Sequence, residues 1–133
     1  MYSHFVLTVL LILFNADHAS ASQRSYVNQF VEKMIQGHQM VLFSKTYCSY
    51  SHKMKHLLRK YHIRDQRIIE LDLEPNMHLI QDYLMYRTGG IRTVPQLYIK
   101  GRFIGGFDST HAKERNGELA TIFARAGITH KSS

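Results

Sequence analysis

The residue best suited to chemistry in this sequence is Cys48, the only cysteine of the 133-residue chain. It lies in the segment KTYCSYS, residues 45–51, where a predicted strand meets a predicted helix. At the start of a helix, unpaired N–H groups and the positive end of the helix dipole stabilise an anion, and Lys45 adds a positive charge. Because the thiolate is the nucleophilic form of cysteine, this position predicts a reactive thiol with a lowered pKa. The alternative, a buried cysteine that acts as a small apolar residue, is disfavoured by the polar neighbours.

Ser51 stands three residues after Cys48, where a redox pair would have its second cysteine. A serine cannot resolve a mixed disulfide, although its hydroxyl can donate a hydrogen bond toward the thiolate. Its other possible role is that of an ordinary residue in the first helical turn. With one cysteine in the chain, any disulfide at Cys48 must be released by an external thiol through exchange. The site therefore needs a place where such a thiol binds.

Hydrophobic periodicity predicts a chain of alternating helices and strands. A strand–helix–strand unit requires a parallel pair with a right-handed crossover, and a hairpin turning at Lys100-Gly101 adds antiparallel strands. We therefore expect one α/β domain with three layers, in which helices cover a mixed four-stranded sheet. The expected helices span residues 25–37, 49–62, 77–90 and 109–127, and the expected strands span residues 40–44, 66–73, 96–99 and 102–104.

The N-terminus carries an unbroken run of apolar residues plus one threonine, Phe5 to Phe14. Its ten residues are too few for a stable transmembrane span, which needs about twenty. The run fits the apolar region of a secretory signal, and Ala19-Ser20-Ala21 supplies the small residues of a cleavage site. We expect a signal peptide at residues 1–21, a mature domain at residues 22–133, and localisation in the secretory pathway lumen or outside the cell. An uncleaved anchor and a buried helix are the alternatives.

The chain is basic, with 17 Lys and Arg against 10 Asp and Glu, a net charge of +7. This balance suits anionic partners in general, but the basic residues are spread along the chain without interleaved exposed aromatic residues, so no nucleic-acid site is predicted. His52 and His56 have the i, i+4 spacing of a metal-binding pair. Lys53 and Lys55 beside them disfavour a cation, so this side of the helix is expected to be a solvated surface.

Two segments and the order of the elements carry a family resemblance. The segments are KTYCSYS, residues 45–51, and RTVPQLYIKGRFIGGFDS, residues 92–109. They resemble the glutaredoxins, which have a thioredoxin-like fold, and the resemblance covers about residues 25–127. The CSYS motif differs from the CGFS motif of the monothiol class devoted mainly to iron–sulfur clusters, and that class's loop insertion is absent. The motif is closer to the two-cysteine class with its second cysteine lost.

The resemblance implies that the external thiol is glutathione. Lys45 and Gln81 would then meet the glycine carboxylate, with Arg92 adding attraction, and Tyr50 would flank the cysteinyl sulfur.

The resemblance also assigns the rest of the tripeptide. Val94, beside Thr93 and before an expected cis Pro95, would pair its backbone with the tripeptide as one added strand. The γ-glutamyl end is assigned to three consecutive residues, Gly106, Phe107 and Asp108. Many two-cysteine members have their aspartate one position later, where this chain has Ser109.

The implied function is a glutathione-dependent thiol–disulfide oxidoreductase that acts on protein–glutathione mixed disulfides through Cys48 alone. A second possibility is a homodimer in which Cys48 of each chain and two glutathiones ligate a [2Fe–2S] cluster, since Ser49 replaces the proline that often follows the cysteine. A third is a redox-inert binding module. The expected partners are glutathione and glutathionylated proteins, and the expected state is a monomer or a cluster-bridged dimer.

Overall fold

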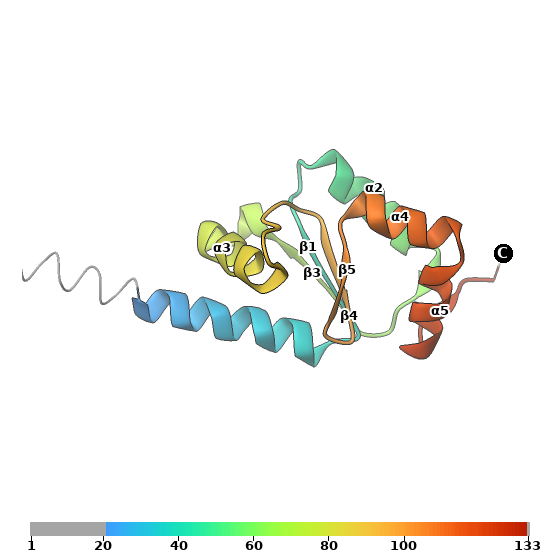
Figure 1. The fold of residues 1–133 in the computed structure, drawn as a ribbon, viewed down its shortest axis with the longest axis horizontal. Helices are drawn as coiled ribbons and strands as arrows, with labels where there is room; N and C mark the ends of the chain where they lie inside the picture. The colour runs from blue at the N-terminus through green and yellow to red at the C-terminus, as the bar shows by residue number, and fades with distance from the viewer. Residues whose placement is uncertain (1–20, 133) are drawn as a thin grey trace, which may run out of the picture.

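The computed structural model describes residues 21–132, with a mixed four-stranded sheet at its centre (Figure 1). The strands are arranged in the order β3-β1-β4-β5. β1 pairs in parallel with β3 and antiparallel with β4, which in turn pairs antiparallel with β5. The expected mixed sheet and its strand directions are confirmed. The bounds are β1 Met40–Ser44, β3 Gln66–Glu70, β4 Gln96–Ile99 and β5 Arg102–Gly105.

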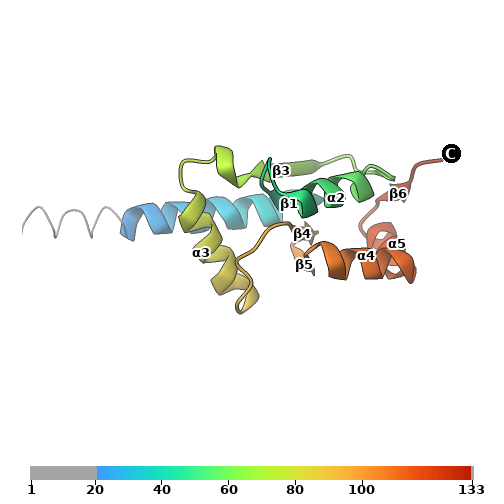
Figure 2. The same ribbon diagram turned by 90° about the horizontal axis from the view of Figure 1, so that it is seen from above.

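One face of the sheet is covered by α2 (Ser49–Leu58), α4 (Phe107–Arg115) and α5 (Glu118–Arg125). Figure 2 shows α2 and α4 side by side on this face. Alternate residues of the strands point into this layer, as the two-residue period of a strand requires. The buried side chains that meet there include Met40, Leu42, Met54, Leu57, Leu97, Leu119 and Phe123.

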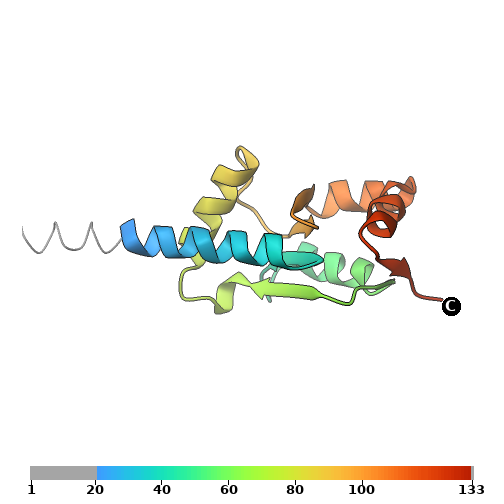
Figure 3. The ribbon, with the colours of Figure 1, turned by 90° about the horizontal axis from the view of Figure 1, so that it is seen from below.

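The other face is covered by a helical segment at residues 21–37 and by α3 (Met77–Thr88). Figure 3 shows the helical segment running along the sheet. Val41 and Phe43 of β1 point to this side, and the ring of Phe43 meets that of Tyr98 edge-on with 5.7 Å between centroids. Helices on both faces give the three layers that the sequence predicts.

Two elements differ from the sequence-based expectation. The helix expected at 49–62 ends at Leu58, and Tyr61–His62 form a short strand, β2, which pairs with β6 (Thr129–His130). The helix expected at 109–127 is broken between α4 and α5, where Gly117 has φ +83° and interrupts the helical conformation. Strands of two residues have no readable periodicity, so hydrophobic patterning misses them.

The strand expected at 66–73 ends at Glu70, and its last three residues form a 3₁₀ turn, η1 (Leu71–Leu73). The hairpin turn is where the sequence places it. Lys100 and Gly101 have φ of 49° and 80°, the left-handed pair that joins strands tightly. A Cβ on Gly101 would also lie 2.6 Å from Oε1 of Gln36, so a side chain is disfavoured there.

The expected signal peptide spans residues 1–21. Of these, residues 1–20 lie outside the described residues, so the structure does not test this prediction. Between residues 21 and 132, no helix has both the length and the apolar character that crossing a bilayer demands.

Candidate active site

Cys48 lies at the junction of β1 and α2, as predicted, and is the N-cap residue of α2. Its backbone is extended, with φ −87° and ψ 120°, and its carbonyl accepts the N–H of His52 at 3.1 Å. The side chain is partly exposed, and Sγ lies 3.9 Å from the carbonyl oxygen of Val94. The Val94–Pro95 peptide bond is cis, as the resemblance implies. The thiol therefore faces the loop that precedes β4.

The surroundings of Cys48 lower its pKa. Partial burial raises the pKa, but hydrogen bonds from the Ser51 hydroxyl and from the N–H groups of Ser51 and Tyr50 lower it, and so does the charge of Lys45. The donors outweigh burial because they stabilise the thiolate and not the thiol. A lowered pKa enlarges the thiolate fraction at neutral pH, which is the property of a reactive cysteine. In a redox-inert binding module, the pKa of this cysteine would be expected to stay near its ordinary value.

Ser51, in the first turn of α2, is fully buried. Its Oγ accepts the backbone N–H of Lys45 at 3.4 Å, so its own hydrogen is available to the sulfur of Cys48. The Ser51 hydroxyl lowers the pKa of Cys48, which is the effect expected of a donor toward the thiolate.

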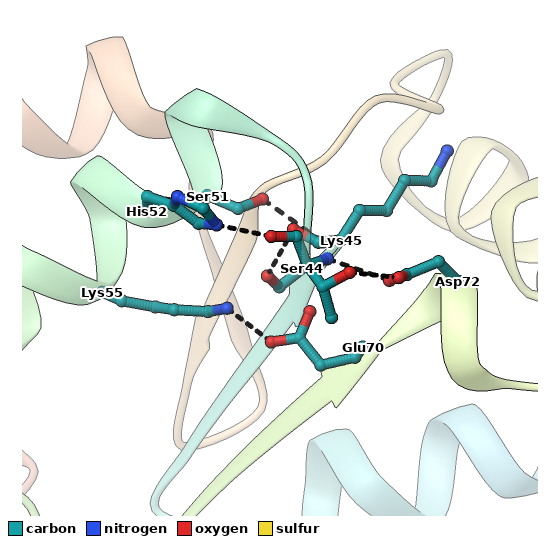
Figure 4. A network of polar contacts seen from close by, with 8 residues as sticks. Ser44, Lys45, Ser51, His52, Lys55, Glu70 and Asp72 are labelled. Carbon is teal, nitrogen blue, oxygen red and sulfur yellow. Dashed lines mark hydrogen bonds and ion pairs between the residues drawn. The ribbon is translucent and has the colours of Figure 1, made fainter.

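The loop between β1 and Cys48 is held by two contacts that sequence reasoning missed (Figure 4). Asp72 of η1 accepts the backbone N–H of Thr46 at 2.9 Å and also its hydroxyl. The Thr46 hydroxyl and N–H together keep the pKa of Asp72 below its usual range. On the other side, Nε2–H of His52 donates to the carbonyl of Thr46 at 2.5 Å. These contacts fix the loop that carries Lys45 and Cys48.

His52 therefore has a structural role in place of the metal-ligand role considered with His56. No group of three or more His, Cys, Asp and Glu side chains in the part of the chain that the structure describes could hold a metal ion. One turn further along α2, Lys55 pairs with Glu70 at 2.5 Å (Figure 4). This ion pair ties α2 to the end of β3, and both side chains are only about a fifth exposed (20% and 19%).

A groove of about 420 Å³ is lined by Val94, whose carbonyl oxygen faces the thiol. Of the residues assigned to glutathione, all line this groove except Lys45, Gln81 and Arg92. The lining residues are Tyr50, Thr93, Val94, Pro95, Gly106, Phe107, Asp108 and Ser109.

The glycine pair that precedes α4 allows its first turn to approach β5 closely. Gly105 has φ +141°, and a Cβ there would lie 1.9 Å from Oγ of Ser109. Ser109 Oγ donates in turn to the carbonyl of Gly106 at 3.3 Å. The first turn of α4, which carries Asp108, therefore forms one end of the groove.

Lys45 and Gln81 do not line this groove. The side chain of Lys45 extends away from the polar cluster toward the side of α3 (Figure 4). Gln81 is buried, and its Nε2 donates to the carbonyl of Arg92 at 3.2 Å. Arg92 itself pairs with Asp82 at 3.2 Å. Gln81 thus supports the loop that leads to Thr93, and a contact of Lys45, Gln81 or Arg92 with a ligand carboxylate stays a prediction.

Comparison with known proteins connects this fold and site to one family. The Glutaredoxin family model matches residues 40–104. An uncharacterized monothiol glutaredoxin of Caenorhabditis elegans is 36% identical over 129 residues, covering 91% of this chain and 88% of that protein. Monothiol glutaredoxin-S6 of rice is 35% identical over 118 residues, covering 89% and 87%. A buckwheat glutaredoxin solved as its glutathione complex superposes with a TM-score of 0.73 at 35% identity, covering 80% of this chain and 94% of that one.

These similarities extend over most of the chain and include the thioredoxin-like arrangement of sheet and helices. The chain belongs to the glutaredoxin family.

Proposed function

We propose that this protein is a glutathione-dependent thiol–disulfide oxidoreductase that removes glutathione from protein mixed disulfides with one cysteine. The observation that carries the proposal is the position of Cys48, a thiol of lowered pKa that faces Val94, and Val94 lines a peptide-sized groove. Membership of the glutaredoxin family supports an oxidoreductase, and the solved glutathione complex of the buckwheat relative supports glutathione as the ligand.

The tripeptide is held in the groove in an extended conformation. The backbone N–H and C=O of Val94 pair with its central residue as an added strand, which places its sulfur beside Cys48. The N-terminus of α4 attracts the γ-glutamyl carboxylate, and Asp108 attracts the amino group. The half-exposed ring of Tyr50 covers the sulfur, and the flexible side chain of Lys45 reaches the glycine carboxylate.

The reaction consists of two thiol–disulfide exchanges. The Cys48 thiolate attacks the glutathione sulfur of the mixed disulfide, a bond forms between these two sulfurs, and the protein leaves as a thiolate that takes a proton from water. A second glutathione, as its thiolate, then attacks the glutathione sulfur bound to Cys48. Oxidised glutathione leaves, and the Cys48 thiolate is regenerated. The hydrogen bonds from Ser51 stabilise Cys48 as the leaving group in this second step.

The test is the release of glutathione from a glutathionylated protein with glutathione and glutathione reductase present. The Cys48→Ser variant is expected to lose all turnover, whereas Ser49→Ala, a change in the adjacent exposed residue, retains it. Turnover that survives the loss of Cys48 contradicts the proposal.

A [2Fe–2S] cluster does not fit the residues of one chain, because such clusters need four ligands and Cys48 supplies one. A cluster would require a second copy of the chain and two external thiols, and no step of the reaction above involves one. Anaerobic reconstitution with iron, sulfide and glutathione tests this alternative, and a colourless monomer would rule out the cluster carrier. A brown dimer with glutathione bound would favour the cluster carrier.

We also propose that the protein acts in the secretory pathway lumen or outside the cell, on the strength of the apolar leader and the small residues that end at Ala21. N-terminal sequencing of the protein from a eukaryotic host is expected to begin at Ser22. An intact Met1 would favour an anchor. The lumen of the secretory pathway is more oxidising than the cytosol, so the enzyme there can either remove glutathione from proteins or add it to them. Both rates are to be measured at the ratio of reduced to oxidised glutathione that is found in the lumen.

A further inference from the structure

A second groove, of about 360 Å³, lies next to the glutathione groove, between α2 and α4. One wall comes from α2, with Lys53, His56 and Leu57, and the other from α4, with Phe107 and His111. The two helices lie side by side in Figure 2. No step of the proposed reaction uses this groove.

The two grooves share the ring of Phe107, which lines both. This ring stacks on His111 with 5.3 Å between centroids and lies 6.0 Å from the ring of Tyr50. The ammonium of Lys53 lies over both aromatic rings, 5.0 Å from the centre of Tyr50 and 5.9 Å from that of Phe107. An aromatic pair with one lysine therefore separates the two binding spaces.

The second groove combines positive charge with apolar surface. Its lining contains two lysines and three histidines but no acidic residue. At its far end Lys60 is 4.0 Å from Glu114, which offsets part of that charge. Within residues 21–132, no carboxylate lies within ion-pair distance of Lys53. Lys53 is thus a cation beside the active site with its charge available to a ligand.

We propose that this groove binds the polypeptide of the glutathionylated substrate and selects segments that carry a carboxylate and an apolar side chain near the modified cysteine. The proposal rests on the function proposed above. Glutathione occupies the groove on the Val94 side, and the substrate chain leaves the disulfide along α2. Lys53 and His56 then meet its acidic residue, while Phe107 and Leu57 meet its apolar one.

The positions of Lys53 and His56 along α2 determine how far the acidic residue of the substrate lies from its modified cysteine. A helix rises about 1.5 Å per residue, so Lys53 is about 7.5 Å and His56 about 12 Å along the axis from Cys48. An extended peptide advances about 3.3 Å per residue. The preferred carboxylate is therefore about two to four residues from the modified cysteine. A small free anion such as phosphate would use the cations but leave the apolar walls uncovered, so a peptide fits this groove better.

The experiment compares two glutathionylated peptides that differ only in glutamate or lysine at the third position from the cysteine, each with a leucine beside it. The intact protein is expected to have a kcat/KM roughly fivefold higher for the glutamate peptide, the upper range for an exposed ion pair. The variants His56→Glu and Lys53→Glu are expected to abolish or invert this preference. Lys33→Glu makes the same charge change as Lys53→Glu, in the helical segment that covers the opposite face of the sheet, and is expected to keep the preference.

A small substrate whose leaving thiol is uncharged separates failure of this inference from failure of the proposed function. The mixed disulfide of glutathione and 2-mercaptoethanol is too short to reach the second groove. The His56→Glu variant is therefore expected to turn over this substrate at the same rate as the protein without the substitution. If the intact protein turns over none of the three substrates, the proposed function is wrong. If it uses both peptides equally, or if the preference survives in His56→Glu and Lys53→Glu, the second groove is not the substrate site.

Discussion

At the N-terminal end of α2, Cys48 has a lowered pKa, whereas just beyond the other end, Tyr61 has a raised one. Burial raises the pKa of both groups. Around the thiol, however, N–H and O–H donors and a lysine stabilise the anion, while the phenol donates its hydrogen to the carboxylate of Glu114, which stabilises the neutral form. At Tyr61 burial and the Glu114 carboxylate act in the same direction, whereas at Cys48 the donors and Lys45 reverse the effect of burial and favour the thiolate.

The largest expected effect is a loss of stability when the buried ring that packs on Tyr61, beyond the C-terminal end of α2, is removed. Phe123 is fully buried, and its ring centroid lies 4.6 Å from that of Tyr61. Phe123→Ala is expected to reduce the free energy of unfolding by about 3–5 kcal/mol, measured by urea denaturation. The pH dependence of Cys48 alkylation should stay unchanged, because the thiol's donors lie at the other end of α2. A shifted profile in this variant, or in the milder Phe123→Leu if Phe123→Ala does not fold, would show that the two ends are coupled.

At the reactive end, Ser51→Ala removes one donor to the thiolate. The pKa of Cys48 is expected to rise, because the variant loses a hydrogen bond that lowers it. A hydrogen bond to a charged group contributes about 1.5 kcal/mol or more, so alkylation of the thiol at pH 6 should slow by about tenfold. Iodoacetamide labelling followed by mass spectrometry gives the rate. Ser49→Ala is the matched control, and an equal effect of both changes would mean that the Ser51 hydroxyl does not act on the sulfur.

A smaller effect is expected from Tyr61→Phe, which removes the hydrogen bond to Glu114. At neutral pH the free energy of unfolding should fall by about 1 kcal/mol. Because the pKa of Tyr61 is raised in the folded state, its contribution is fully present below the unfolded value of about 10 and is lost as the pH rises through the folded value. When the pH is raised above 10, the free energy of unfolding should therefore fall less in Tyr61→Phe than in the protein that retains Tyr61. Thermal unfolding at pH 7 and pH 11 measures this, and Tyr26→Phe, at an exposed position, is the control.

The two ends of α2 also differ in how far the sequence predicts them. The position of Cys48 at a strand–helix junction follows from local patterning. The groove residues between Thr93 and Asp108 were assigned through the resemblance to glutaredoxins, while patterning placed the strand and hairpin that carry them. The Tyr61 end was predicted wrongly as helix, because β2 and β6 are two-residue strands that pair across 67 residues or more of chain, as His62 does with Thr129.

The contacts that position the active-site loop were also missing from the sequence reasoning. Asp72 meets Thr46 across 26 residues of chain, and no spacing rule connects them. His52 was considered for its distance from His56, whereas its contact is with the Thr46 carbonyl. Local patterns predicted which residues are near the thiol in the chain, but the side chains that hold the loop depend on how η1 and α2 pack around it.

Measuring the pKa of Cys48 tests most directly whether this site is a reactive thiolate, and because the chain has one cysteine the measured rate belongs to that residue. The rate of alkylation by iodoacetamide is followed between pH 4 and pH 10 in the folded protein and in urea. We predict a midpoint in the folded protein clearly below the ordinary cysteine value of about 8.5, returning toward that value in urea. A folded midpoint at or above that value would contradict the claim that the surroundings of Cys48 make it a reactive thiolate.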